Sequence, residues 1–366
     1  MNRRTSPFRL SRRDFVRLSA AASALPVADS LLLPRGISAA QEEASGPIVV
    51  AGWGGRFTEA SRTYLAEPFT QETGIEVQFV DAPGEQLSRV LAQKNAGKIE
   101  WDLMDAVTAS DSYVAFDQGL AAKLPADLKT KFDGMLNVVN DYGFAFAALG
   151  DIIACNTEEA EACPTTPAEF WDVEQFPGPR VLCSFLPLEV LTFASLGAGI
   201  PKDELFPLDL DLAFSKLEEI RPHVTVWYTS GDQSEQVFRD GEVVMGQIWS
   251  GRAYNVLDQG VPLQISWEQG VYEPGFWFAL EGAPHQAAAF QFLDWIATHP
   301  EDQAKWATEM RYAPANPEAF DYMDEETAKR LADYPENFEK LIVPDWQWYA
   351  ENSATIQERW NEFLAG

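Results

Sequence analysis

The sequence predicts an α/β protein of two lobes, each built around a largely parallel β-sheet. Short apolar runs alternate with segments of helical period, first over residues 48–118 and again over residues 180–254. The chain has 366 residues, of which 46% are hydrophobic and 23% charged, and this is enough for two domains of ordinary size. An apolar, strand-like segment from Tyr142 to Cys155 joins the two series.

The first series contains two turns that follow expected strands. One is glycine-rich, Gly52-Trp53-Gly54-Gly55-Arg56, and the other is polar, Thr108-Ala109-Ser110-Asp111. Ligands of open α/β sheets bind outside the carboxyl ends of strands, so both turns are candidate contacts. The expected strands are Ile48–Ala51, Ile75–Val80 and Trp101–Val107, and the expected helices are Glu59–Thr73, Gln86–Ala96 and Tyr113–Gln118.

The second series repeats this alternation and then returns the chain to the first lobe. A short element at Phe170-Trp171-Asp172 precedes it. The expected strands are Arg180–Cys183, Gln264–Trp267 and Phe276–Leu280, and the expected helices are Leu188–Gly197, Leu212–Ile220, Gln286–Thr298 and Pro300–Met310. Tryptophans near the C-terminus, among them Trp346 and Trp360, are typical packing anchors.

The stretch from Val224 to Tyr254 predicts a strand, a turn, a helix, a second strand and a second turn. Asp232 and Glu235 have the spacing of a capping box, so we expect a helix to start at Asp232 and to stop at Asp240-Gly241. Asp232 at this turn is either that helix cap or a ligand contact.

Each of the two strands in this stretch carries an indole near its end. Trp227 lies at the end of the first strand and Trp249 at the end of the second, before the expected turn Ser250-Gly251. The strand ends make this stretch the second candidate region for ligand binding.

The N-terminus predicts a twin-arginine signal peptide over residues 1–40. Arg12-Arg13 precede a weakly apolar run from Leu18 to Leu33, and Ser38-Ala39-Ala40 offers small residues for cleavage. Pro26 and Asp29 interrupt the run, which argues against a transmembrane anchor. We therefore expect export to the periplasm.

The charge balance argues against nucleic acid and anionic lipid as partners. The formal net charge is −29, and the first 40 residues hold seven arginines against two acids, so the remainder is more acidic still. This field either attracts cations or serves solubility.

The cysteines and histidines argue against metal or cofactor chemistry. Cys155 and Cys163 are eight residues apart and form a candidate disulfide, while Cys183 lies in an apolar run and is expected to be buried. The three histidines are scattered, and no nucleophile elbow is visible. We expect no metal, no cofactor and no enzymatic activity.

Several phrases resemble those of the spermidine/putrescine-type solute-binding proteins of bacterial ABC importers. They are AGWGGRF, FTQETGIEV, WDLMDAVTAS, AEFWDVEQFPG, VWYTSGDQS, DGEVVMGQIWSGRAY, EPGFWFAL and DWQWYAENSATIQERWNEFL. The resemblance implies a two-lobed periplasmic binding protein fold of type II, with the ligand in the interlobe cleft. It places lobe 1 at residues 46–150 and 281–366, lobe 2 at 151–280, and hinge crossings near 150 and 275.

The resemblance also implies which residues face the cleft. In that family carboxylates grip the amines and aromatic rings sandwich them. Glu189 in LPLEVLTFA matches one such acid, but Leu186 and Ala279 stand where two others are expected. The candidate ligand-binding residues are Trp53, Gly54, Gly55, Arg56, Thr108, Ser110, Asp111, Glu189, Ser230, Asp232, Gln233, Trp249, Arg252 and Trp277.

Two binding functions follow, together with one alternative from another class. The first is a monomeric periplasmic receptor that captures an amine-bearing solute such as putrescine or spermidine by lobe closure and delivers it to an inner-membrane permease. The second is the same role for a zwitterionic, amino-acid-like or aminophosphonate ligand, held by Glu189 at the amine and by Arg252 or Arg56 at the acid. Either arginine could instead pair with surface acids. The third is an exported hydrolase, which the lack of a catalytic motif disfavours.

Overall fold

The computed structural model describes residues 46–132, 135 and 139–366. The predicted signal peptide lies outside these residues. These residues belong to a single compact unit with two separate β-sheets. Among the described residues no helix is both long and apolar enough to span a membrane.

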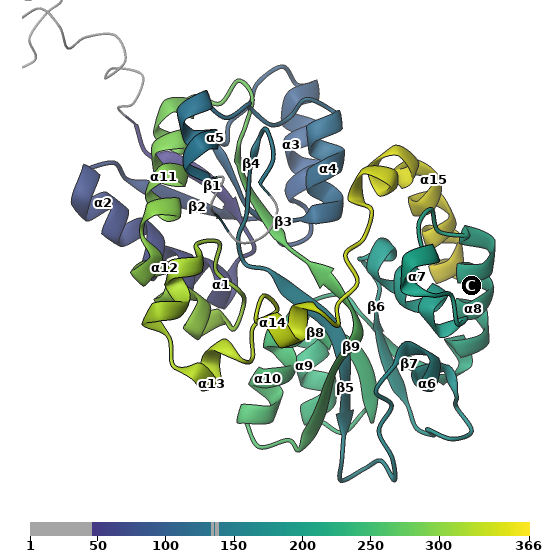
Figure 1. The fold of residues 1–366 in the computed structure, drawn as a ribbon. Coiled ribbons are helices and arrows are strands. Elements are labelled where there is room, and N and C mark those ends of the chain that lie inside the picture. Colours follow the sequence, from purple (N-terminus) through teal and green to yellow (C-terminus); the bar gives the residue numbers. More distant parts are fainter. Residues whose placement is uncertain (1–45, 133–134, 136–138) are drawn as a thin grey trace, which may run out of the picture. The chain divides into compact units, whose positions relative to one another are not determined.

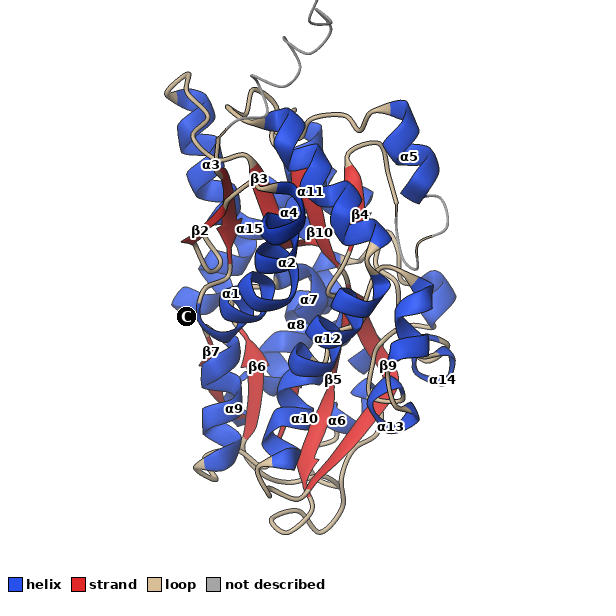
Figure 2. Ribbon diagram, turned by 90° about the vertical axis from the view of Figure 1, so that its left-hand side faces the viewer, coloured by secondary structure: helices blue, strands red, loops and turns tan. Residues whose placement is uncertain are grey.

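The first sheet has the strand order β2-β1-β3-β10-β4. The strands β1 (Ile48–Gly52), β2 (Val77–Asp81) and β3 (Leu103–Thr108) are parallel, and β10 (Gly275–Ala279) pairs antiparallel with β3 and with β4 (Gly143–Ala145). The strands are flanked by helices (Figures 1 and 2). The helical elements that belong with this sheet in sequence are α1 (Gly55–Ser61), a π-helical turn (Arg62–Ala66), α2 (Glu67–Thr73), α3 (Gln86–Asn95), α4 (Ala109–Asp117), α5 (Ala126–Phe132), α11 (Gln286–Thr298) and α12 (Pro300–Met310).

The second sheet has the order β7-β6-β8-β5-β9. In it β6 (Arg180–Cys183) is parallel to β7 (Val224–Tyr228) and to β8 (Met245–Trp249), whereas β5 (Leu149–Asn156) runs antiparallel to β8 and to β9 (Leu263–Glu273). Its helices are α6 (Pro167–Trp171), α7 (Pro187–Gly197), α8 (Leu210–Ile220), α9 (Gly231–Arg239) and α10 (Ser250–Asp258), with short 3₁₀ turns at Lys202–Glu204 and Arg221–His223.

The chain passes between the sheets twice, at nearby positions. It leaves the first sheet after β4 and enters the second at Leu149, and it returns between Glu273 and Gly275 (Figure 1). The α/β architecture with two sheets agrees with the predicted fold class. Both crossings fall where hinges were expected, near residues 150 and 275; that they bend remains a prediction.

The C-terminal segment contacts elements that belong with both sheets. It contains a 3₁₀ turn (Pro317–Tyr322), the short helices α13 (Glu325–Ala328) and α14 (Pro335–Phe338), and the long helix α15 (Trp346–Ala365). We expected all of it in the first lobe, yet α15 contacts both α4 and α7. Near its end, Trp360 is 1% exposed and its Nε1 donates to the carbonyl of Ser184 at 2.7 Å.

Trp227 takes part in the same packing. Its ring lies edge to face with Trp360, at a centroid distance of 6.0 Å, and with Phe363, at 5.4 Å. The indole of Trp227 therefore anchors α15. As expected, the C-terminal tryptophans Trp346 and Trp360 are buried in packing contacts.

Several expected elements differ from the structure. The polar turn expected at Thr108–Asp111 is largely the start of α4, and the helix expected at Glu59–Thr73 begins earlier, at Gly55, and contains the π-helical turn. The segment from Tyr142 to Cys155 forms two strands rather than one, and the strand expected at Gln264–Trp267 extends to Glu273. Ser250-Gly251 is not a turn but the start of α10. A side chain at position 251 would come within 2.5 Å of the Tyr312 ring and 2.9 Å of the Met310 carbonyl, so glycine here permits close packing of the helix rather than a chain reversal.

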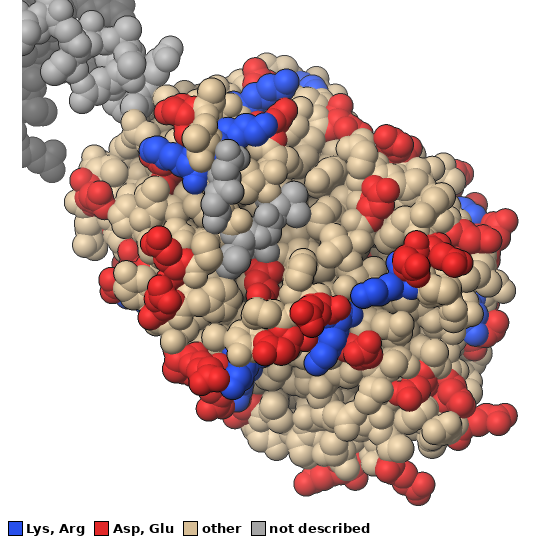
Figure 3. Space-filling model, viewed as in Figure 1, with Lys and Arg blue, Asp and Glu red and all other residues tan. Residues whose placement is uncertain are grey.

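The cysteines are arranged as the sequence suggested. Cys155 and Cys163 form a disulfide, and Cys183 is a buried free thiol. Acidic side chains outnumber basic ones over the face shown in Figure 3.

Candidate ligand-binding site

A cavity of about 550 Å³ lies where strand ends of both sheets converge. The first sheet contributes the segment from Trp53 to Phe57, which follows β1, and Thr108 at the end of β3. The second sheet contributes the segment from Thr229 to Asp232, which follows β7, and Trp249 at the end of β8. The candidate regions from the sequence are thus brought together.

The start of helix α1 forms one wall. Gly54 has φ 80°, a left-handed conformation that favours glycine, and a side chain there would lie 3.2 Å from the Asp81 carboxyl carbon. The amide of Gly54 donates to Thr58 Oγ1 at 2.9 Å. The first amides of a helix have no partner within the helix, so this wall presents donors and the positive end of the helix dipole.

The start of helix α9 forms the opposite wall, and it corrects one expectation. The N-cap is Ser230, not Asp232: the Ser230 hydroxyl accepts from the Gln233 amide at 3.2 Å, and the Gln233 side chain accepts from the Thr229 amide at 2.8 Å. Ser230 rather than Asp232 caps the helix because its extended backbone points the Ser230 hydroxyl at the Gln233 amide. Asp232 is freed to pair with Arg252.

Two indoles from different sheets meet at the cavity. Trp53 and Trp249 lie edge to face, with ring centroids 6.1 Å apart and an interplanar angle of 88°. Trp53 Nε1 donates to the Ala106 carbonyl at 2.8 Å, which fixes the ring, and Phe185 packs on Trp249 at 5.9 Å. Trp249 Nε1 is buried and has no acceptor among the described residues.

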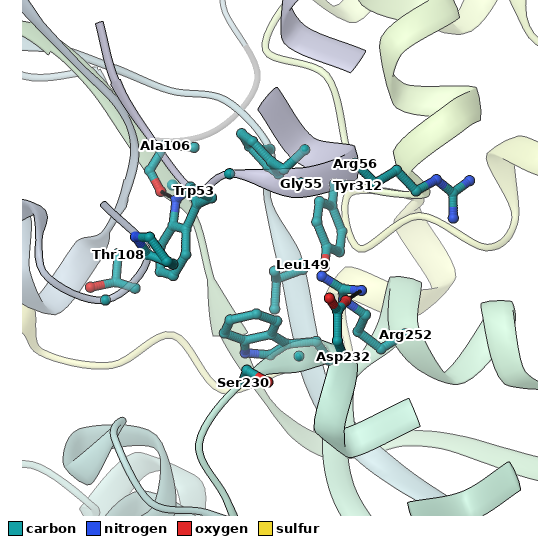
Figure 4. Close-up of a pocket in the computed structure, with 18 of the residues that line it drawn as sticks. Trp53, Gly55, Arg56, Ala106, Thr108, Leu149, Ser230, Asp232, Arg252 and Tyr312 are labelled. Carbon is teal, nitrogen blue, oxygen red and sulfur yellow. Dashed lines mark hydrogen bonds and ion pairs between the residues drawn. The ribbon is translucent and has the colours of Figure 1, made fainter. Parts of the chain in front are cut away.

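Arginines occupy one side of the cavity, opposite Trp53 and Thr108 (Figure 4). Arg252 Nη1 contacts Asp232 at 2.6 Å and Glu235 at 2.8 Å, and only 17% of its side chain is exposed. Burial alone would lower the pKa of Arg252, but Tyr312, Glu235 and Asp232 raise it above the ordinary value. Arg56 is 44% exposed and pairs with Glu309 at 3.0 Å. Both arginines therefore pair with acids and also line the cavity.

A buried carboxyl group, that of Glu273, also lines the cavity, and further acids lie behind it. Glu273, on β9, is 2% exposed; its Oε1 accepts from the Ala109 amide at 2.7 Å, and it lines the cavity. Glu189, on α7, is fully buried and interacts directly with Glu273. Burial raises the pKa of both carboxyls, and Glu189 raises that of Glu273 further. Burial and Glu189 raise the pKa of Asp111 to about 6.

The structure divides the fourteen predicted residues into two groups. Those that line the cavity are Trp53, Gly54, Gly55, Arg56, Thr108, Ser230, Asp232, Trp249 and Arg252. Those that are not part of the lining are Ser110, Asp111, Glu189, Gln233 and Trp277. Glu189 reaches the cavity only through Glu273, and Gln233 serves the α9 cap.

Trp277 is a clear correction. We expected it to face the cleft, but it is fully buried against Phe146 and Phe292. It lies on β10, in the interior of the first sheet, and its neighbours Phe276 and Phe278 contact Phe116 on the other side. Strand alternation therefore directs Trp277 into the core.

Sequence reasoning missed several lining residues, including Glu273, Tyr312, Asp81 and Phe185. The strand expected from the sequence ended at Trp267, so Glu273 was not assigned to it. Tyr312 follows α12, and only the tertiary packing of this segment brings it to the cavity. The acid in YEPGFW was a visible signal for Glu273, since an isolated carboxylate next to an aromatic strand is unusual.

Two α/β lobes with a cavity lined by strand ends and helix starts from both sheets define a two-lobed binding protein. The chain belongs to the family of bacterial extracellular solute-binding proteins, whose family profile matches residues 64–339. It is therefore a solute-binding protein of an ABC transporter. The curated relatives of this chain are named as solute-binding proteins.

Two curated relatives illustrate the range of solutes. The gamma-aminobutyric acid-binding protein of Pseudomonas aeruginosa is 26% identical over 334 residues, covering 90% of this chain and 94% of the relative. The spermidine/putrescine-binding periplasmic protein of Escherichia coli is 23% identical over 347 residues, covering 91% and 95%. The resemblance to solute-binding proteins of bacterial ABC importers is confirmed, and its narrower polyamine type stays a prediction.

Two solved structures are similar in fold. A GABA receptor is 32% identical with a TM-score of 0.80, and the match covers 87% of this chain and 97% of that chain. MotA, a binding protein from A. tumefaciens B6 in complex with glucopine, is 28% identical with a TM-score of 0.79, covering 87% and 99%.

Proposed function

We propose that this protein binds a small zwitterion with a primary ammonium and a carboxylate, such as 4-aminobutyrate, and delivers it to an ABC permease. One observation carries the proposal: the cavity presents the largely buried Arg252 beside the start of α9 in one part of its lining and a buried acid, Glu273, in another. A zwitterion complements both. A relative and a solved structure named for gamma-aminobutyric acid support this choice.

The carboxylate end of the ligand is assigned to Arg252 and the start of α9. Arg252 Nε is buried and has no acceptor among the described residues, although Nη1 serves two acids. A side chain at Gly231 would come within 2.7 Å of Nε, so the glycine keeps this edge of the guanidinium open. A charge-assisted hydrogen bond here contributes about 1.5–3 kcal/mol.

The ammonium end is assigned to the acids at Glu273. Glu273 Oε2 is buried and receives no hydrogen bond from an N–H or O–H group of the described residues. A buried ammonium without a partner costs several kcal/mol, and a carboxylate removes that cost. Glu189 does not line the cavity, and it influences the ligand through its interaction with Glu273.

The middle of the ligand is assigned to the apolar lining. Trp53 and Trp249 offer indole faces, and Leu149 and Ala147 line the cavity between the sheets. Contact of a cation with an indole adds about 0.5–2 kcal/mol. Micromolar affinity needs about 8 kcal/mol, which these contacts supply together with hydrogen bonds from the helix starts.

Polyamines were the first prediction from the sequence, and the cavity favours the zwitterion over them. Leu186 and Ala279 replace two acids that a polyamine site needs, and the cavity instead holds Arg56 and Arg252. A second ammonium next to a buried arginine is repelled. Polyamines are the competing ligand class, because a distant relative is named for binding spermidine and putrescine.

Thermal unfolding with a panel of solutes tests the proposal. Ligands that bind the native state raise Tm by mass action. We expect 4-aminobutyrate and amino acids of similar length to raise Tm, and putrescine and spermidine to have little effect. A Tm shift with polyamines alone would contradict the zwitterion assignment.

We further infer that the chain is exported through the twin-arginine pathway, cleaved near Ala40 and active in the periplasm as a monomer. The arginine pair, the weakly apolar run and the small residues before Gln41 support export. N-terminal sequencing of the periplasmic protein and size-exclusion with light scattering test cleavage and oligomeric state.

A further inference from the structure

We propose that Glu189 and Glu273 share one proton at the back of the cavity, and that the ammonium of the ligand displaces this proton when it binds. The inference rests on the proposed function, because it takes a primary ammonium as the ligand group. The ammonium keeps its own protons, the pair of carboxyls changes from one negative charge to two, and the displaced proton passes to solvent.

The burial of the two carboxyls and their lack of donors favour a proton between them. Neither oxygen of Glu189 receives a hydrogen bond from an N–H or O–H group of the described residues, and the same holds for Glu273 Oε2. The two side chains nevertheless interact with each other at hydrogen-bonding range. Ionised carboxylates only accept hydrogen bonds, so one of the two must carry a proton for them to bond.

Among the described residues, no cation is found to act on the pair. The charged groups that act on it from neighbouring elements are the carboxyls of Asp151 on β5 and Asp111 on α4. The other titratable neighbours of the pair are thiol and phenol groups, and these are Cys183 on β6, Tyr272 on β9 and Tyr349 on α15. Tyr228 on β7 acts on Asp151. On β8, the Gln247 amide reaches only the Glu189 carbonyl, at 3.5 Å. A second negative charge here is costly until a cation arrives.

Two further unsatisfied groups indicate that the missing partner enters from the cavity. Both oxygens of Asp151 are buried and receive no hydrogen bond from the described residues, and Asp151 pairs across the sheet with Trp249. Trp249 Nε1 is also buried without an acceptor, and Trp249 lines the cavity. Glu273 is the one member of the acid group that lines the cavity, so it is the point of contact for the ammonium.

The pKa directions agree with this geometry. Burial raises the pKa of Glu189, and burial together with Glu189 raises the pKa of Glu273 well above the ordinary value. An ammonium in contact with Glu273 has the opposite effect, because a nearby cation favours the ionised acid. Because binding releases a proton, ligand affinity rises with pH. The rise continues as long as Glu189 and Glu273 share a proton in the ligand-free protein.

Isothermal titration calorimetry with 4-aminobutyrate at neutral pH, in two buffers of different ionisation enthalpy, measures the proton release. We expect close to one proton per bound ligand, and an affinity that rises up to tenfold per pH unit. In Glu189→Gln the glutamine amide donates to Glu273 without a shared proton, so the release falls to near zero. Asp105→Asn is the matched control: Asp105 is also buried without a donor among the described residues, but it does not line the cavity, so proton release is unchanged.

Infrared spectroscopy of the ligand-free protein tests the shared proton without any ligand. Burial also raises the pKa values of Asp105 and Asp151, so the shared proton is identified by difference. We expect the protonated-carboxyl band at neutral pH to lose intensity in both Glu189→Gln and Glu273→Gln, with circular dichroism showing that each variant is folded. No loss of intensity in either variant, or 4-aminobutyrate binding with no proton release, would overturn the inference. If 4-aminobutyrate does not bind, the proposed function fails, and the infrared band alone decides whether the proton is shared.

Discussion

Trp53 and Trp249 come from the ends of strands in different sheets, and their rings meet edge to face at a centroid distance of 6.1 Å. Trp53 follows β1 of the first sheet, and Trp249 ends β8 of the second. A ligand that lies against these rings contacts both lobes at once. This contact links solute recognition to the arrangement of the two sheets.

Replacing Trp249 by alanine is expected to weaken 4-aminobutyrate binding by about 1–2 kcal/mol, or roughly 5- to 30-fold in Kd, because the cation–aromatic and packing contacts are lost. Trp227→Ala is the matched control. Trp227 lies in the same stretch but packs on α15, so its loss lowers Tm and leaves Kd unchanged. Calorimetry and thermal unfolding of both variants separate the two effects. Equal loss of affinity in both would contradict the assigned role of Trp249.

Replacing Arg252 by methionine is expected to weaken 4-aminobutyrate binding by at least about 2 kcal/mol, because truncating one partner of a buried charge pair costs about 2–5 kcal/mol. Arg56→Met provides the comparison. Arg56 is 44% exposed, so its effect on binding is small. Kd values for 4-aminobutyrate and putrescine in each variant provide the readout. A preference for putrescine that does not rise in Arg252→Met would count against the carboxylate assignment.

The stability of the ligand-free protein is expected to depend on Asp111. Its pKa is about 6 in the folded protein because of burial and the charge of Glu189, whereas an ordinary aspartate has a pKa of about 3.9. The native state thus binds more protons than the unfolded state, and this contribution to stability is present below pH ~4 and lost as pH rises through ~6.

Urea unfolding of the wild type and of Asp111→Asn, measured at pH values from 4 to 7, tests this contribution. The free energy of unfolding of the wild type relative to the variant is expected to fall by on the order of 2 kcal/mol over that range. A difference between the two proteins that does not change with pH would show that Asp111 has an ordinary pKa.

Trp360→Ala is expected to destabilise the protein by about 3–5 kcal/mol, the usual cost of removing a large buried aromatic side chain. Trp360 is 1% exposed and contacts Phe214, Trp227 and the Ser184 carbonyl, but it does not line the cavity. Denaturant unfolding measures the loss. Affinity for the solute, measured below the lowered Tm, is expected to stay at the wild-type value, and a large affinity change would reveal coupling between α15 and the site.

The strand-end turns of the site could be predicted from local sequence. Gly52 to Arg56 and Ser230-Gly231 connect β-branched strands to the starts of α1 and α9, and their residue types alone predict backbone near a ligand. Local rules also gave the bounds of α11 and α12, whose starts and ends agree with the structure. These features depend only on neighbours in the chain.

The missed features depend on contacts between distant segments. Strand β9 reaches Glu273 because it pairs with β5, where Leu149 lies opposite Glu273. The direction of Trp277 depends on which face of β10 meets α11, and this is set by long-range sheet order. Gly251 was interpreted as a turn residue because its close contact with Tyr312 cannot be read from the local sequence.

The most direct test of the zwitterion site is a crystal structure of the mature protein with 4-aminobutyrate. We predict the carboxylate at Arg252 and the start of α9, the ammonium at Glu273, and the carbon chain against Trp53 and Trp249. A ligand bound in the reverse direction, or bound away from Arg252 and Glu273, would contradict the account.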